Sequence, residues 1–130
     1  MTKPHPGQRA MKHCLVVNDS RPIRKVACRI LQDLQFKTDE AEDGASALAH
    51  CRSQMPELIL LDLNMNMNSI EFLKTLRREH GGSRPVVVFC TTENDVARIS
   101  EALNAGANEY VMKPFDRSII AAKLAEVGLA

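Results

Sequence analysis

The sequence has no excess of charge of either sign and no long apolar run. Its 17 Lys and Arg residues are balanced by 16 Asp and Glu residues, a formal net charge of +1 over 130 residues. A chain this close to neutral lacks the long-range electrostatic field that marks proteins that bind nucleic acid or anionic membranes. We therefore expect neither as a partner. The longest apolar runs, LILL and VVVFC, are far shorter than the roughly 18 residues of a membrane-spanning helix. The N-terminus also lacks the apolar core of a secretory signal, and we predict a soluble, cytoplasmic protein.

Motifs that mark several other kinds of site are missing as well. The four cysteines stand singly, with no C-x-x-C pair and no histidine at a zinc-ligand spacing, which argues against a redox motif and a structural metal site. We expect most of them to be small core residues. Neither G-x-G-x-x-G nor G-x-x-x-x-G-K occurs, so nucleotide binding of the Rossmann or P-loop type is not supported.

The length and composition fit one globular domain. With 45% apolar residues, 130 residues can bury a sizeable core, and no shift in composition suggests a second domain. Residues 1–10 contain two prolines and a glycine without any periodic pattern. We therefore predict that they form a disordered extension, natural or left over from expression, and that the domain covers residues 11–130.

Hydrophobic patterning predicts five successive units of a strand followed by a helix. The expected strands are 13–17, 36–41, 57–62, 85–91 and 109–112, and the expected helices are 20–34, 44–52, 70–79, 95–105 and 116–127. The first helix has the clearest signal, because Ser20 can serve as its N-cap and Pro22 stands in its first turn. Strands rich in Val, Ile and Leu without alternation are typical of a parallel sheet covered on both faces by helices. We predict an α/β fold with a doubly wound, five-stranded parallel sheet.

Polar residues lie at the ends of four of the expected strands. They are Asn18 and Asp19, then Asp62, then Thr91 and Thr92, and finally Tyr110 and Lys113. In a doubly wound sheet, ligands bind outside the carboxyl ends of the strands. Carboxylate and amide oxygens suit Mg²⁺ with its waters and a substrate phosphate, a lysine can pair with a phosphoryl oxygen, and a carboxylate can accept a phosphoryl group as a mixed anhydride. The set therefore predicts phosphoryl-transfer chemistry.

Each of these residues also has a purely structural explanation. Asn18 and Asp19 are of the types favoured for capping a helix, the two threonines could lie in a turn, and Lys113 could be a solvated loop cation. We prefer a functional explanation for the set, because four strand ends carry such residues together.

Four motifs resemble the receiver domain of CheY-like two-component response regulators. In order they are CLVVNDS, LILLDLNM, VVFCTTEND and NAGANEYVMKPFD, and the similarity runs from His13 to Val127. The last motif is the most specific, because AGA, an aromatic residue and KPF occur together in it. The resemblance implies a flavodoxin-like (βα)5 fold with strand order 2-1-3-4-5. It also implies a bacterial phosphorelay protein of the chemotaxis-like type, which takes a phosphoryl group from a histidine kinase or phosphotransfer protein and requires Mg²⁺.

The resemblance assigns roles to single residues. Asp62 matches the phosphoacceptor and, with Asp19 and the backbone carbonyl of Asn64, the ligands of Mg²⁺. Lys113 and Thr91 match the lysine and hydroxyl that hold the phosphoryl oxygens.

The same resemblance implies how a signal leaves the domain. Tyr110 matches an aromatic switch whose ring moves inward as the threonine is drawn toward the phosphate. The Lys113–Pro114 peptide is expected to be cis. The fourth helix, fifth strand and fifth helix, about 95–127, are expected to bind the downstream target protein.

The sequence departs from the family pattern at two places. The family has an acid where this chain has Asn18, so the metal site has lost one formal charge; a unit charge at close range is worth on the order of a few kcal/mol, and Mg²⁺ should bind more weakly. The amide can still accept a hydrogen bond from a metal-bound water. The loop after Asp62 has Asn66 in place of Pro, is one residue short, and has Ser69 near the position of a Gly. We expect this loop to follow another path, with its asparagines in left-handed conformations that Asn tolerates.

A basic set on the first helix, Arg21, Arg24, Lys25 and Arg29, is usually a solvated helix face. It is also a hypothetical docking site for a kinase, a phosphotransfer protein or a cyclic dinucleotide, because arginines bind phosphates in bidentate fashion.

Three functions compete. The first is a stand-alone receiver without its own output module, a signalling switch and not a metabolic enzyme. The second is a phosphorylation-impaired receiver that acts as an interaction or second-messenger module. The third is a phosphatase or phosphotransferase with a nucleophilic aspartate, which is disfavoured because such enzymes carry the nucleophile on the first strand and have a cap domain.

Overall fold

A computed structural model of the chain describes residues 11–63, 68–92 and 96–129. Its strands are β1 Lys12–Val17, β2 Phe36–Ala41, β3 Leu58–Asp62, β4 Val86–Thr91 and β5 Glu109–Met112. Its helices are α1 Arg21–Asp33, α2 Gly44–Ser53, α3 Ser69–Arg78, α4 Val96–Ala105 and α5 Arg117–Glu126. All ten elements agree with the sequence prediction to within a residue or two. The predicted extension, residues 1–10, lies outside the described residues.

The five strands form one parallel sheet in the order β2-β1-β3-β4-β5. This is the strand order of the flavodoxin-like fold, and the prediction of a doubly wound α/β sheet is confirmed. The order reverses at β1, which lies between β2 and β3. The strand carrying Asp62 therefore has β1 on one side and β4, followed by β5, on the other.

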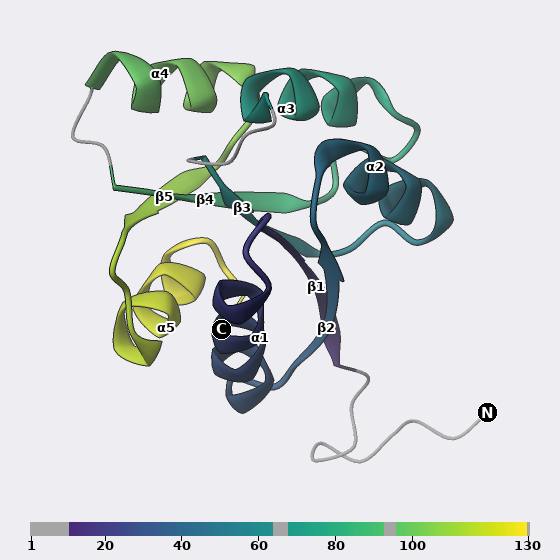
Figure 1. Cartoon of the computed structure of the whole chain (residues 1–130). Coiled ribbons are helices and arrows are strands. Elements are labelled where there is room, and N and C mark those ends of the chain that lie inside the picture. The colour runs from purple at the N-terminus through teal and green to yellow at the C-terminus, as the bar shows by residue number, and fades with distance from the viewer. Residues whose placement is uncertain (1–10, 64–67, 93–95, 130) are drawn as a thin grey trace.

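Helices cover both faces of the sheet, as Figure 1 shows. One core cluster packs the sheet against α2, α3 and α4, and the other packs it against α1 and α5. Successive strand residues alternate between the clusters: Leu15 and Ile59 belong to the first, and Val16 and Leu60 to the second. Both faces are apolar because both are covered, which is why the strands read as continuous Val, Ile and Leu.

The same alternation decides which strand-end residues share a face. Val17 pairs with Leu61, so Asn18 and Asp62 each follow one residue later, on the side of α1 and α5. Val111 belongs to the cluster on that side, and Lys113 follows it by two residues. The period of two therefore brings Asn18, Asp62 and Lys113 to one face at the carboxyl edge of the sheet.

The four cysteines lie buried and unbonded to one another. Burial, followed by the negative charge of Asp62, raises the pKa of the Cys90 thiol to about 12, and burial raises that of Cys51 to about 11. These thiols are protonated at neutral pH. This agrees with their prediction as small core residues.

Two further features concern the backbone and the membrane. The Lys113–Pro114 peptide is cis, as the resemblance implied. Among the helices that the structure describes, none is long and apolar enough to cross a bilayer.

Candidate functional site

Asp62 is the last residue of β3, and every residue of that strand is buried. Its own exposed fraction is only 6%. The Lys113 ammonium donates to Asp62 Oδ1 at 2.8 Å, and the Asn18 amide donates from Nδ2 to Asp62 Oδ2 at 2.7 Å. A buried carboxylate requires such partners, because burial without them costs several kcal/mol.

The two oxygens of Asp62 face different neighbours. Asn18 follows β1, which pairs with β3 on one side, whereas Lys113 follows β5, which lies beyond β4 on the other side. Oδ2 is therefore the oxygen on the β1 side, where Asp19 also lies, and Oδ1 is the oxygen on the β5 side.

Asn18 is held in one orientation by its surroundings. Its Oδ1 accepts the backbone N–H of Ser20 at 2.8 Å, and its backbone carbonyl accepts from the Arg24 guanidinium at 2.7 Å. The first bond is an Asx turn, which directs the Nδ2 group toward Asp62. Ser20 is the N-cap residue of α1, as predicted, although its side chain makes no capping bond. The Asn18 side chain bonds to the turn before α1, which agrees with its structural explanation, and its functional role stays a prediction.

Glu40 on β2 holds two members of the basic set on the first helix. Arg24 donates from Nε to Glu40 Oε1 at 2.9 Å, and Lys25 donates from Nζ to Oε2 at 2.6 Å. The Lys25 ammonium, with the Arg24 guanidinium beside it, holds the pKa of Glu40 below its ordinary value. Arg24 bonds to Glu40 and to the Asn18 carbonyl, so it supports the site as a scaffold residue. Arg21, Lys25 and Arg29 are exposed.

Ser69 is a site residue whose role the sequence did not indicate. It is the first residue of α3, buried, and its hydroxyl donates to the backbone carbonyl of Asp62 at 3.1 Å. Asn68 is the N-cap of α3, and its side chain accepts from Glu71 N–H at 3.1 Å. Asn68 has φ −81°, so the expectation of a left-handed conformation is wrong for this residue. Asn64 and Asn66, the other residues of that expectation, lie outside the described residues.

Arg98 on α4 was also not predicted. Its Nη2 donates to the backbone carbonyl of Leu63, the residue after Asp62, at 2.7 Å. No sequence signal distinguishes this arginine from an ordinary solvated one.

Thr91 and Tyr110 lie toward α4. Thr91 ends β4 and is fully buried. The Tyr110 ring stacks on Phe89 with 5.7 Å between ring centroids, and the Lys123 ammonium lies 5.9 Å from its centroid. Tyr110 is half-buried, and its predicted role as a switch stays a prediction.

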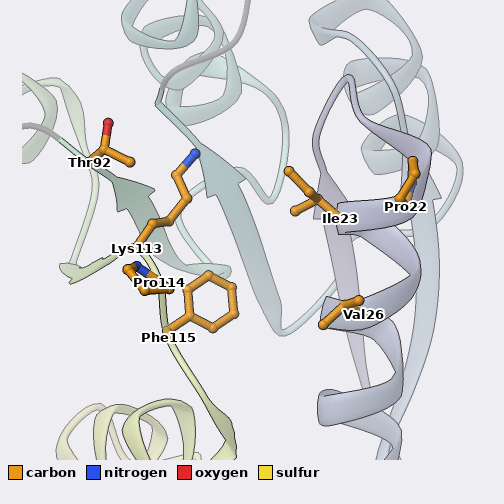
Figure 2. Close-up of a pocket in the computed structure, with 7 residues that line it drawn as sticks. All are labelled: Pro22, Ile23, Val26, Thr92, Lys113, Pro114 and Phe115. Carbon is orange, nitrogen blue, oxygen red and sulfur yellow. The ribbon is translucent and has the colours of Figure 1, made fainter.

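A cavity of about 370 Å³ adjoins the site, between α1 and the turn after β5. Its lining residues are Pro22, Ile23, Val26, Thr92, Lys113, Pro114 and Phe115. In Figure 2, Phe115 faces Ile23 and Val26 across it, and the Lys113 side chain extends along its inner end. Ile23 and Phe115 also line a small space beneath Asp62, so the cavity lies directly against the site.

The chemistry of the donor set fits Mg²⁺. Asp62 and the exposed Asp19 supply two carboxylates at one edge of the sheet, and Mg²⁺ uses one or two carboxylates and keeps several waters. In the part of the chain that the structure describes, no group of three or more His, Cys, Asp or Glu side chains could hold a metal ion. A Mg²⁺ site with two carboxylates and several waters does not require such a group. Asn64, the predicted carbonyl ligand, lies outside the described residues.

The fold and the site define a class of protein: a doubly wound α/β domain with a buried aspartate, paired with a lysine, at the carboxyl edge of its sheet. The family described as the response regulator receiver domain matches residues 14–125. The chain belongs to this family.

Curated relatives and solved structures agree with this assignment. The phosphate regulon transcriptional regulatory protein PhoB of Escherichia coli (strain K12) is 35% identical over 117 residues, which are 89% of this chain and 51% of PhoB. The chain thus spans about half the length of the curated relatives it matches. The chemotaxis response regulator CheY4 of Vibrio cholerae has a TM-score of 0.84 at 30% identity, covering 91% of this chain and 99% of CheY4. A CheY-like receiver domain protein of Methanospirillum hungatei JF-1 shares the fold, with a TM-score of 0.81 at 24% identity, covering 91% of this chain and 94% of that protein.

Proposed function

We propose that the domain is a phosphorylation switch of a two-component system, in which Asp62 accepts a phosphoryl group from a histidine kinase or a phosphotransfer protein. The observation that carries the proposal is the buried Asp62 carboxylate at a strand end, between the ammonium of Lys113 and the amide of Asn18. A buried ion pair of this kind contributes little to stability relative to apolar packing, so a functional reason for it is favoured.

In the proposed reaction, one Asp62 oxygen attacks the phosphorus of the donor. The new bond is an acyl phosphate, the bond between phosphorus and the donor nitrogen or oxygen breaks, and the donor leaves with that electron pair. Lys113 exchanges its bond with the carboxylate for one with a phosphoryl oxygen, and the Thr91 hydroxyl donates to another. Such a transfer depends mainly on position and charge neutralisation. The domain is thus a switch that promotes its own phosphorylation and dephosphorylation, not an enzyme acting on a metabolite.

Asp19, Asp62 and the carbonyl of Asn64 would hold Mg²⁺, which when bound neutralises charge on the phosphoryl oxygens. Asn18 contributes an amide in place of a carboxylate, so this set carries one charge less than in the family pattern.

The signal would leave through α4, β5 and α5. Apolar side chains are exposed on these helices, among them Val96, Leu103 and Ile119. We propose that this face binds the downstream protein, and that Tyr110 changes position with Thr91. The apolar side chains support a protein partner at this face.

The phosphodonor protein would dock over α1. Ile23 and Val26 are 43% and 60% exposed beside the cavity of Figure 2, and Arg21 and Lys25 flank them with positive charge. An apolar centre with a charged rim is typical of a protein interface. The apolar lining and the bonds of Arg24 to Glu40 and Asn18 disfavour the alternative of a cyclic dinucleotide at this place.

The test is the intact mass of the protein after incubation with acetyl phosphate, with and without Mg²⁺. We expect a Mg²⁺-dependent gain of one phosphoryl group. Asp62→Asn should abolish it, and Asp116→Asn, which alters the exposed cap of α5, should not. No gain in the wild-type protein would favour the second function, a phosphorylation-impaired interaction module.

A further inference from the structure

Asn18 bonds directly to the phosphoacceptor. Nδ2 of Asn18 lies 2.7 Å from Oδ2 of Asp62, and both residues are 6% exposed. We infer that Asn18 is a latch: its amide occupies the metal-facing oxygen of Asp62 in the metal-free domain, and Mg²⁺ must displace it to bind. This inference rests on the proposed function and names a regulation of the same site.

The position of the bond supports direct competition. Oδ2 is the Asp62 oxygen on the β1 side, and Asp19, the other carboxylate proposed for Mg²⁺, also follows β1. A cation shared by Asp19 and Asp62 would therefore approach the oxygen that the Asn18 amide holds. The oxygen on the other side is held by Lys113.

The latch is preformed, which makes it effective. The bond of Asn18 Oδ1 to Ser20 N–H fixes the side chain, and the bond of Arg24 to the Asn18 carbonyl fixes the backbone. A hydrogen bond to a buried carboxylate is stronger than one between neutral groups. Little conformational entropy is lost when it forms, because the donor is already oriented.

Competition by the Asn18 amide and the loss of a carboxylate charge predict different effects of substitutions at position 18 on Mg²⁺ affinity. If only the lost carboxylate matters, a neutral residue without an amide should bind Mg²⁺ no better than Asn18 does. If Asn18 is a latch, removal of its amide should tighten Mg²⁺ binding although no charge is added. Restoring the carboxylate should tighten binding further, because it removes the competitor and adds charge.

Two neutral variants separate the latch from the turn. Asn18→Ser keeps a hydroxyl that can accept the Ser20 N–H, and lacks the Nδ2 donor. Asn18→Ala removes both. Asn18→Asp restores the charge, and Asn104→Ala, at an exposed position of α4, is the matched control.

The experiment is a Mg²⁺ titration of the ¹⁵N-labelled domain by NMR, which follows the Asn18 side-chain NH₂ signal and the backbone amides. In the wild-type domain, we expect the NH₂ signal to shift at the Mg²⁺ concentrations that saturate the site. Asn18→Ser should lower the half-saturating Mg²⁺ concentration about three- to tenfold, the factor that corresponds to one net hydrogen bond. Asn18→Asp should lower it further, and Asn104→Ala should leave it unchanged. If Asn18→Ala lowers the melting temperature, the result with Asn18→Ser decides.

The latch is overturned if Asn18→Ser binds Mg²⁺ no more tightly than the wild type, or if Mg²⁺ saturates the site without moving the NH₂ signal. The acetyl phosphate assay distinguishes this from a failure of the proposed function. If the wild type is phosphorylated and Asn18→Ser binds Mg²⁺ no more tightly than the wild type does, only the latch is overturned and the proposed function stands. If neither the wild type nor Asn18→Asp binds Mg²⁺ or gains a phosphoryl group, the proposed function fails with it.

Discussion

The two edges of the sheet are held by polar side chains of opposite kinds. At the carboxyl edge, the Asp62 carboxylate accepts from two side chains, Lys113 and Asn18. At the amino edge, the Arg77 guanidinium donates mainly to backbone carbonyls. The Asp62 carboxylate can exchange these side-chain donors for another partner, such as a metal ion or a phosphoryl group, whereas the backbone carbonyls around Arg77 are fixed by the fold. The Asp62 site at the carboxyl edge can therefore change its partners, whereas the Arg77 contacts at the amino edge are permanent parts of the fold.

Arg77 joins the ends of α3 and α4 to the starts of β4 and β5. It donates to Gly106 O at 2.9 and 2.6 Å, from Nε and Nη2, and from Nη1 to Gly82 O and Pro85 O, both at 2.8 Å. Nη2 also donates to Asn108 Oδ1 at 3.0 Å. Burial lowers the pKa of Arg77, and an arginine remains charged nonetheless.

Gly106 completes this arrangement. A Cβ atom on it would lie 2.6 Å from Arg77 Cγ, and its φ of +125° is a conformation that only glycine adopts without strain. The AGA motif of the sequence therefore has a structural reason at its glycine: close approach to Arg77 at the amino edge.

The largest effect on stability should follow the loss of the Arg77 contacts at the amino edge. Arg77→Ala leaves three backbone carbonyls without this donor and opens a cavity, and we expect it to lower the free energy of unfolding by about 3–4 kcal/mol. The melting temperature should fall by roughly 10 °C. Thermal denaturation followed by circular dichroism measures this. The neighbouring exposed Arg78→Ala is the control and should change stability by less than about 0.5 kcal/mol; equal losses in the two variants would contradict the role of Arg77.

A smaller effect on stability is expected at the Asp62 site at the carboxyl edge. Lys113→Met removes the ammonium partner of the Asp62 carboxylate and leaves its bond with the Asn18 amide. It should cost about 2 kcal/mol, because a buried charge loses its partner. In an Asp62→Asn background the same change should cost less than about 1 kcal/mol, because no charge is left unpaired. Urea denaturation of the four proteins gives the coupling energy. Additive losses would show that the ion pair does not exist in solution.

The smallest effect concerns the pH dependence of the ion pairs that Glu40 makes with Arg24 and Lys25. The pKa of Glu40 is depressed by Lys25 and Arg24, so its contribution to stability is present at neutral pH and is lost as the pH falls through its folded-state pKa. Glu40→Gln should lower stability at pH 7 by under about 1 kcal/mol. The difference from the wild type should shrink as the pH falls through the folded-state pKa of Glu40, which lies below its ordinary value. Melting temperatures from pH 7 downward measure it, with the exposed Glu101→Gln as control; a difference that does not change as the pH falls would contradict the ion pair.

The fold was predictable because local signals agreed with one another. Apolar strands, amphipathic helices and the signals of Ser20 and Pro22 at the start of the first helix all indicate the same ten elements, and the period of two brings Asn18, Asp62 and Lys113 to one face. The resemblance supplied the strand order, which patterning by itself leaves open.

The rest of the site depends on contacts between distant elements, which a single sequence does not encode. Nothing in the sequence pairs Arg98 with the Leu63 carbonyl or Ser69 with the Asp62 carbonyl. The basic neighbours of Arg24 on α1 suggest a docking surface, whereas its bond to Glu40 depends on the pairing of β2 with β1. The sequence indicates only that Asn18 lacks the charge of an acid, and the direction of its amide toward Asp62 follows from the turn at Ser20.

The measurement that tests the central claim most directly is the location of the phosphoryl group. After phosphorylation with acetyl phosphate and Mg²⁺, borohydride reduces an aspartyl phosphate to homoserine, which peptide mass spectrometry can place in the chain. We predict homoserine at position 62 and none at Asp19 or in the Asp62→Asn protein. Homoserine at another position, or a phosphorylated protein without homoserine at 62, would contradict the account.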